Sequence, residues 1–141
     1  MPSPFEALSG PGKPLRPEPP DAAEFAGLLR SGLARMADAG VKSLALESRF
    51  DLAYNAAHAL SFAALRWHGY RSSNRYIVFQ LLPHTLGLGP EVWRVLDKCH
   101  QLRNLGEYEG SLNIDARIVT DLLTACRAVA AKVQALPPLA A

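Results

Sequence analysis

The sequence has little cysteine, no long apolar run and no strong excess of charge of either sign. Its two cysteines, Cys99 and Cys126, occur in helical, mostly apolar surroundings without CxxC spacing, which is typical of buried thiols in a reducing compartment. No apolar stretch approaches the roughly 18 residues that a membrane span needs, and the first residues have neither the basic segment nor the apolar core of a signal peptide. We therefore expect a cytoplasmic protein with no membrane partner.

Motifs for metal binding and for common catalytic sites are also missing. His58, His68, His84 and His100 lack the HxxxH, HExxH and ExxH spacings of metal sites on helices,. No GxSxG motif or phosphate-binding loop occurs, and the glycines of residues 86–89 follow no strand, so we interpret that segment as a turn,. We expect no metal and no cofactor.

Composition predicts one globular domain. The chain has 141 residues, of which 49% are hydrophobic and 20% charged, with a formal net charge of +2. This length suffices to bury a substantial core. An isoelectric point near 8.7 is too mildly basic to indicate nucleic-acid binding by itself.

Proline marks both ends of the predicted domain. Residues 1–20 contain seven prolines and few apolar residues that could form a core, so we expect an extended, mobile tail. Residues 137–141 follow the last helix as a short C-terminal tail. The folded domain is therefore expected at residues 21–136.

Apolar residues between these tails recur at intervals of three and four, as expected for amphipathic helices. Asp21 is a candidate N-cap for the first helix and Ser48 for the second, whereas Pro90 suits the first position of the fourth. No segment alternates convincingly as a strand. The predicted fold class is all-α, an up-and-down bundle of four to five helices, with helices at about residues 21–40, 48–68, 73–82, 90–108 and 115–136.

The second predicted helix is apolar on almost every side. A narrow polar seam contains Asp51, Asn55, His58 and Arg66. A helix buried on two sides lies either at the centre of a bundle or partly in a dimer contact. We expect a homodimer, with the contact at Ala56, Ala59 or Ala63, or else on the fourth helix.

The most unusual stretch of the chain, residues 100–110, closes the fourth helix. Arg103 continues the apolar stripe of that helix and needs a partner, because an unpaired buried charge costs several kcal/mol. Asp51 and Glu107 are the natural partners, in either a buried ion pair or a groove. Five polar or ring-bearing side chains fall within about 140° of arc on this helix: His100, Arg103, Asn104, Glu107 and Tyr108.

The polar seam and this stretch would share a groove if the two helices pack side by side. Residues 66–104 also carry six Lys and Arg against only Glu91 and Asp97, with aromatic side chains interleaved. Basic and aromatic groups together suit contacts to phosphates and bases. The alternative is a solvated charged surface with the aromatic rings in the core. The basic set comprises Arg66, Arg71, Arg75, Arg94, Lys98 and Arg103.

Arg103 and Asn104, together with the Ala-rich helix around residues 49–57, resemble the HEPN domains (higher eukaryotes and prokaryotes nucleotide-binding). The likeness covers roughly residues 21–136. It implies a small helical bundle, a motif Arg at Arg103 and a polar follower at Asn104. Many HEPN proteins are metal-independent ribonucleases in which two motifs face one cleft; others act with a nucleotidyltransferase in toxin–antitoxin pairs or bind RNA without cleaving it.

The motif His of that family has no counterpart after Arg103, where Tyr108 stands at the corresponding position. Tyrosine titrates near 10 and is a poor general base at pH 7. Tyr108 could still donate a hydrogen bond or stack on a base. His100, one turn before Arg103, is the candidate substitute for the missing base.

These observations predict a HEPN-like protein that binds RNA or a nucleotide around Arg103 without catalysis, in a toxin–antitoxin or stress and defence system. One alternative is a non-enzymatic, dimeric, antitoxin-like interaction module. The other is a weak metal-independent ribonuclease with His100 and Arg103 as catalytic residues. The resemblance separately implies a nucleotidyltransferase or another toxin–antitoxin protein as a partner. The predicted binding residues are Asp51, Asn55, His58, Arg103, Asn104, Glu107 and Tyr108.

Overall fold

The computed structural model describes residues 3–110 and 113–140 and is all-α, as the sequence predicts. Four long helices form the bundle, and three short helices and a two-stranded sheet complete the described part of the chain. No helix in that part is long and apolar enough to cross a membrane. In chain order the elements are α1 (Pro4–Ala7), β1 (Arg16–Pro17), α2 (Ala22–Ala39), α3 (Leu46–Trp67), β2 (Tyr70–Arg71), α4 (Arg75–Gln80), α5 (Leu82–Thr85), α6 (Pro90–Glu109) and α7 (Ala116–Gln134).

Local sequence signals set most helix ends. Asp21 and Asp115 cap α2 and α7 by accepting hydrogen bonds from the backbone N–H of Glu24 and Ile118, each at 2.9 Å,. Pro90 occupies the first turn of α6, and Gly110 ends that helix in the left-handed conformation,. The N-cap expected at Asp21 and the helix start expected at Pro90 are confirmed.

The predicted N-cap Ser48 is wrong, because α3 begins two residues earlier, at Leu46. Ala45 occupies the N-cap position without a side-chain hydrogen bond. Leu46 packs against the core, and Arg49 Nε donates to the carbonyl of Ala39 at the end of α2 at 2.9 Å. Tertiary contacts therefore fix a helix start that lacks a local cap.

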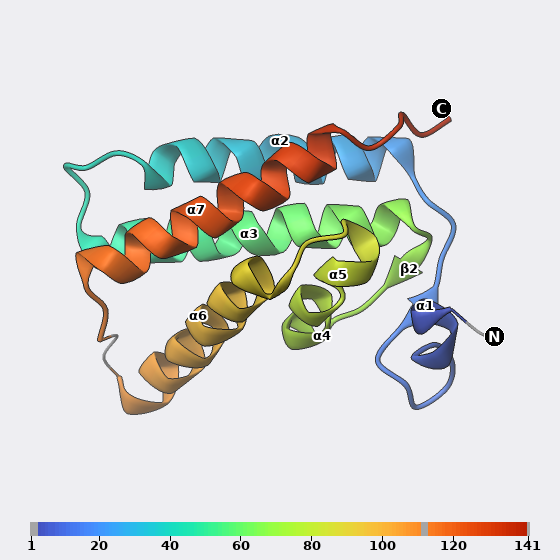
Figure 1. The fold of residues 1–141 in the computed structure, drawn as a ribbon, viewed down its shortest axis with the longest axis horizontal. Helices are drawn as coiled ribbons and strands as arrows, with labels where there is room; N and C mark the ends of the chain where they lie inside the picture. Colours follow the sequence, from blue (N-terminus) through green and yellow to red (C-terminus); the bar gives the residue numbers. More distant parts are fainter. Residues whose placement is uncertain (1–2, 111–112, 141) are drawn as a thin grey trace.

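Helix α3 lies at the centre of the molecule (Figure 1), with α2 along one side and α4 and α5 on the other. Helix α7 crosses α3 diagonally and contacts α2, α3 and α6. The α2–α3 approach is close: a Cβ atom on Gly32 would lie 2.6 Å from Leu60 Cγ. Ala56, Ala59 and Ala63, where we expected a dimer contact, are buried within one chain. The burial of α3 on both sides thus has an explanation that requires no second copy.

The N-terminal segment differs from the extended tail that the sequence predicts. Residues 3–20 pack against the bundle, where Leu15 is buried and β1 pairs antiparallel with β2, Arg16 opposite Arg71. Phe5 stacks on Tyr70 with ring centroids 5.1 Å apart. Many prolines reduce the entropy that ordering costs, and their carbonyls still accept hydrogen bonds. The predicted start of the folded domain at residue 21 is therefore wrong, because residues 3–20 belong to the packed structure. Residues 1–2 lie outside the described residues.

The C-terminal end also contacts the bundle. Trp67 Nε1 donates to the Pro137 carbonyl at 2.9 Å, which ties the residues after α7 to the end of α3. Residue 141 of the predicted C-terminal tail lies outside the described residues.

Candidate functional site

Helices α3, α4 and α6 meet around the ring of Tyr54, which is fully buried. The guanidinium carbon of Arg103 lies 4.9 Å from the centroid of this ring, and that of Arg75 lies 5.5 Å from it. A guanidinium within about 6 Å of a ring centroid is attracted to the aromatic face. We call Tyr54, Arg75, His100 and Arg103 the Tyr54 cluster.

Local sequence positions explain how the cluster assembles. Arg75 is the first residue of α4, whose N-cap Asn74 accepts from the backbone N–H of Ile77 at 3.3 Å. His100 and Arg103 are three residues apart on α6 and therefore share a face of that helix. Tyr54 comes from α3, so three separate helices supply the cluster.

Arg103 is neither in a buried ion pair nor without a partner. Its Nη2 lies 3.3 Å from Glu107 Oε1, one turn on, with the two side chains 27% and 64% exposed. Glu107 is thus the partner, whereas Asp51 is exposed and contributes its backbone carbonyl to Asn55. Ion pairs of this exposure contribute about 0–1 kcal/mol to stability. The geometry holds Arg103 in place mainly through the Tyr54 ring.

His100 connects α6 to α3. Its Nδ1 lies 2.7 Å from the Tyr54 hydroxyl, and its Nε2 lies 3.2 Å from Asn104 Nδ2. With Asn104 donating to Nε2, the neutral ring carries its proton on Nδ1 and donates it to the Tyr54 oxygen. Burial, assisted by the charges of Arg103 and Arg75 and opposed by Asp97, lowers the pKa of His100 below its usual 6.5. The ring is therefore neutral at pH 7 and both nitrogens are engaged.

His58 and Asn55 extend the cluster along α3. Burial lowers the pKa of His58 to about 4, with smaller contributions from Arg75, His100 and Arg103. Asn55 Oδ1 accepts from Arg75 Nη1 at 3.1 Å. The structure therefore brings His58, Asn55, His100, Arg103, Asn104 and Glu107 into one region.

Tyr108 does not join this region, contrary to our expectation. Its side chain is 91% exposed, and α6 diverges from α3 toward its C-terminal end (Figure 1). The last turn of α6 therefore extends past the elements that cover the rest of the helix. At this position the Tyr108 ring makes no contact with the Tyr54 cluster.

Two members of the predicted basic set are structural. Arg66 is only 2% exposed, donates four hydrogen bonds and forms one further ion pair, to Glu18. Its partners are the Glu18 and Glu24 carboxylates and the carbonyls of Glu18, Pro19 and Tyr70. Arg71 also binds both carboxylates, at 2.6 Å each. We call Glu18, Glu24, Arg66 and Arg71 the Arg66 cluster.

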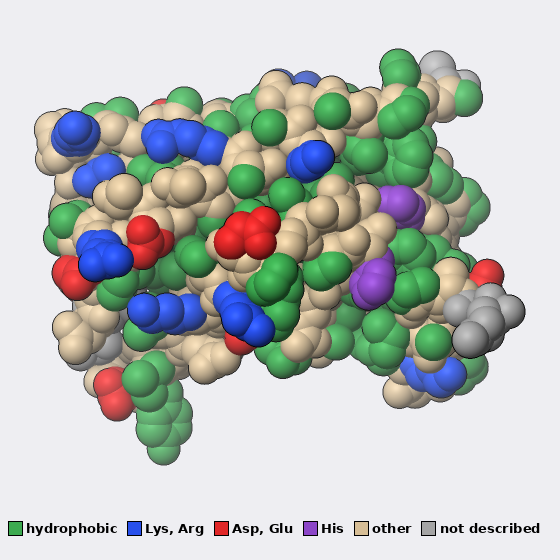
Figure 2. Space-filling view, viewed as in Figure 1, with side chains coloured by type: hydrophobic (Ala, Val, Ile, Leu, Met, Phe, Trp, Pro, Cys, Tyr) green, Lys and Arg blue, Asp and Glu red, His purple; other side chains and the backbone are tan. Residues whose placement is uncertain are grey.

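On the face that Figure 2 shows, Lys and Arg side chains are interspersed with Asp and Glu and form no single basic patch. Arg94 and Lys98 line a cavity of about 230 Å³ next to Asp121. A second cavity, of about 670 Å³, lies at the N-terminal segment. Arg103 lines neither cavity, and the two cavities share no lining residue.

Sequence reasoning missed the central role of Tyr54 and Arg75. Tyr54 looked like a core residue, and it is buried, but its hydroxyl and its ring face polar groups. The available signal was the spacing of four between Tyr54 and His58 on α3, which places both rings on one face. Arg75 gave no local signal beyond its position after the N-cap Asn74.

Among the described residues, no group of three or more His, Cys, Asp and Glu side chains could hold a metal ion. Comparisons with models of protein families, with curated proteins and with solved structures find no match to this chain.

Proposed function

We propose that the chain binds RNA or a nucleotide through phosphate contacts to Arg75 and Arg103, without catalysing a reaction. The observation that carries the proposal is the pair of half-buried guanidiniums that share one aromatic ring. Contact with the ring restrains the position of each guanidinium,. Planar, oriented forks of this kind suit phosphate oxygens.

Local charge also favours an anion. Among the described residues, no carboxylate oxygen lies within 4.0 Å of the Arg75 guanidinium, whose bond is to the neutral Asn55 amide. Arg103 has only the exposed Glu107. The neighbouring His58 and His100 are neutral at pH 7, because their pKa values are lowered. The cluster therefore carries a net positive charge that a phosphate would neutralise.

The resemblance to HEPN domains supports the same location, since Arg103 and Asn104 match the motif. The departure at Tyr108 supports binding over cleavage, because the position of the motif His holds an exposed phenol. His100 is a weak substitute, since both of its nitrogens have partners and its pKa is lowered. A part in a toxin–antitoxin or stress and defence system belongs to this proposal through the resemblance alone.

Fluorescence anisotropy with a labelled single-stranded 12-nucleotide RNA tests the proposal, with AMP as an unlabelled competitor. Arg75→Ala and Arg103→Ala are each expected to weaken binding about five- to tenfold. Each should also lower the slope of log affinity against log salt by about 0.7. Arg30→Ala is the matched control, because Arg30 is an exposed arginine on α2, on the opposite side of α3 from α4. Equal losses in all three variants would contradict the proposal.

The same RNA tests the ribonuclease alternative when it is incubated without metal ions. We expect intact RNA. Cleavage that disappears in His100→Ala would establish a ribonuclease and overturn the non-catalytic proposal.

A second candidate function is an interaction module, favoured by exposed apolar side chains on the last turns of α6. Leu105 and Tyr108 are three residues apart on one face, and both are largely exposed,. Such a patch suits a protein contact with a second copy or a nucleotidyltransferase. Light scattering of the wild type and of a Leu105→Glu/Tyr108→Glu variant tests the homodimer: a dimer mass that the variant reduces to a monomer mass would support this function.

A further inference from the structure

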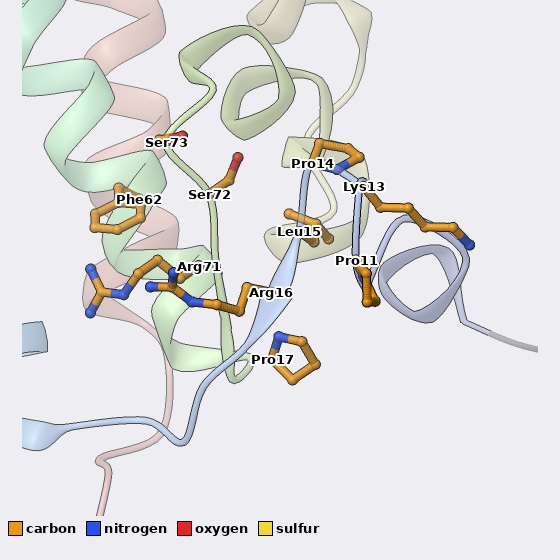
Figure 3. Close-up of a pocket in the computed structure, with 11 residues that line it drawn as sticks. Pro11, Lys13, Pro14, Leu15, Arg16, Pro17, Phe62, Arg71, Ser72 and Ser73 are labelled. Atoms are coloured by element: carbon orange, nitrogen blue, oxygen red, sulfur yellow. The ribbon is translucent and has the colours of Figure 1, made fainter.

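The N-terminal segment encloses a cavity of about 670 Å³ that the Tyr54 cluster does not use. Figure 3 shows its walls: Phe62 from α3, Arg71 and Ser72 from the chain that leaves it, and Leu15 and Arg16 from the N-terminal segment. A volume of this size is within the range of small-molecule sites, which are mostly apolar with a few polar groups.

The wall on the N-terminal side is held by backbone hydrogen bonds. Gly10 N–H donates to the Leu15 carbonyl at 3.1 Å, and Leu15 N–H donates to the Leu8 carbonyl at 3.0 Å. Gly10 and Gly12 both have positive φ, as this tight loop requires,. A loop closed in this way lowers the ordering cost of binding. Three prolines that line the cavity restrict the wall further: Pro11, Pro14 and Pro17,.

The apolar lining would receive the body of a ligand. Leu15 is buried and Phe62 half-buried, and the Arg71 guanidinium carbon lies 5.5 Å from the Phe62 ring centroid. The Arg71 guanidinium thus lies against the Phe62 ring, and it is already paired with Glu18 and Glu24. It has little capacity left for a ligand.

Arg16 is the available cation. Its side chain is 69% exposed, and its one ion pair in the described structure is to Glu18 Oε1, at 3.5 Å. It extends toward Arg71 from the paired strand, whereas the Lys13 amine points away and donates to the Ala7 carbonyl at 3.2 Å (Figure 3).

The charges of the side chains at this cavity indicate how many negative charges a bound ligand should carry. The guanidiniums of Arg16, Arg66 and Arg71 share the two carboxylates of Glu18 and Glu24. One positive charge remains among these five side chains. The other cation that lines the cavity, Lys13, directs its amine to the Ala7 carbonyl instead. We propose that this cavity binds a small monocarboxylate with an aromatic body, its carboxylate on Arg16 and its ring against Phe62 and the prolines that line the cavity. The site is separate from the proposed phosphate contacts at Arg75 and Arg103.

A matched set of probes tests this inference by NMR on the ¹⁵N-labelled full chain: 2-naphthoate, the neutral 2-naphthamide and the dianionic 2-naphthyl phosphate. We expect saturable shifts of the Arg16, Arg71, Ser72 and Ser73 amides with 2-naphthoate. 2-Naphthamide should bind at least fivefold more weakly, and 2-naphthyl phosphate no more tightly than 2-naphthoate.

Variants assign the two halves of the site. Arg16→Gln removes an exposed side chain and should fold normally; it is expected to weaken 2-naphthoate binding about tenfold and to abolish the preference over 2-naphthamide. Phe62→Leu should weaken both probes, and Arg30→Gln should change neither. Shifts that do not saturate, equal affinities for 2-naphthoate and 2-naphthamide, or an Arg16→Gln variant that binds like the wild type would overturn the inference. So would phosphate binding tenfold tighter than carboxylate.

Discussion

The Arg66 cluster and the Tyr54 cluster both place arginine beside acidic and aromatic groups, yet they differ in what the arginine has left to offer. Arg66 is 2% exposed, donates four hydrogen bonds to oxygen atoms and forms a further ion pair with Glu18. Arg103 lies against an aromatic face and has one exposed carboxylate nearby. A saturated, buried guanidinium holds structure together, whereas a stacked, half-exposed one remains able to bind a ligand.

The two arginines also differ in how far along the chain their partners lie. Arg66 joins α3 to residues more than 40 positions earlier in the chain and so fixes the N-terminal segment. Arg103 pairs within its own helix, and its contact to α3 is a ring rather than a carboxylate. Both were members of one basic set by sequence, and only burial and partner geometry distinguish them.

The largest effect is expected from Arg66→Ala, which leaves Glu18 and Glu24 with one fewer buried partner. The free energy of unfolding, measured by urea denaturation, should fall by about 3–5 kcal/mol. Arg66→Lys should recover part of this loss, because one charge returns without the planar fork. If Arg66→Ala lowers the free energy of unfolding by less than about 1 kcal/mol, the Arg66 cluster does not stabilise the fold.

The next largest effect concerns the segment that Arg66 fixes. Leu15→Ala removes a buried side chain next to Leu65 and Val78 and should lower the free energy of unfolding by about 2–4 kcal/mol. Ala7→Gly at the exposed end of α1 is a control within the same segment, expected to cost about 1 kcal/mol or less. If Leu15→Ala melts like the wild type, the segment is a mobile tail as the sequence predicts.

Acid should weaken the Arg66 cluster selectively. A hydrogen bond from Arg71 lowers the pKa of Glu18; burial raises that of Glu24, but hydrogen bonds from Arg71 and Arg66 outweigh it and lower the pKa overall. Because the folded pKa values lie below the ordinary 4.5, this stability is present above pH 4.5 and is lost as the pH falls through the folded values. Urea denaturation between pH 7 and pH 3 should show the loss, and Glu18→Gln/Glu24→Gln should flatten it.

Arg103→Ala should cost much less stability than Arg66→Ala, about 1 kcal/mol or less, because its ion pair is exposed and its ring contact is partly solvated. Urea denaturation of the two variants side by side measures the contrast. Equal costs would mean that both clusters are structural and would remove the basis for a binding role at Arg103.

The last expectation is a titration of the two histidines at the Tyr54 ring, His100 and the adjoining His58. His58, with its pKa lowered to about 4, should remain neutral in ¹H–¹³C NMR spectra well below pH 6.5. Since the folded pKa lies below the ordinary 6.5, the corresponding stability is present above pH 6.5 and is lost as the pH falls toward 4. Phosphate near Arg75 and Arg103 should raise the pKa of His100. A His58 that titrates near 6.5 would contradict its buried position.

The sequence by itself determined the features that depend on neighbours within a few residues. Asp21 and Asp115 cap their helices, Pro90 and Gly110 bound α6, and the apolar face of α7 is buried, because capping and helical periodicity act over one or two turns. Glu107 as the partner of Arg103 is likewise an i,i+4 relation,.

Tertiary structure alone decided which arginine is buried, which ring both Arg75 and Arg103 contact, and what covers α3. An apolar helix specifies that it will be covered but not by which element, so Ala56, Ala59 and Ala63 could not reveal that α2 and α7 supply the cover. The partners of Arg66 lie more than 40 residues away, and no local rule relates positions so far apart. Their pairing follows from the packing of the whole chain, because a buried guanidinium is tolerated only where the fold brings enough oxygen atoms to its five donors.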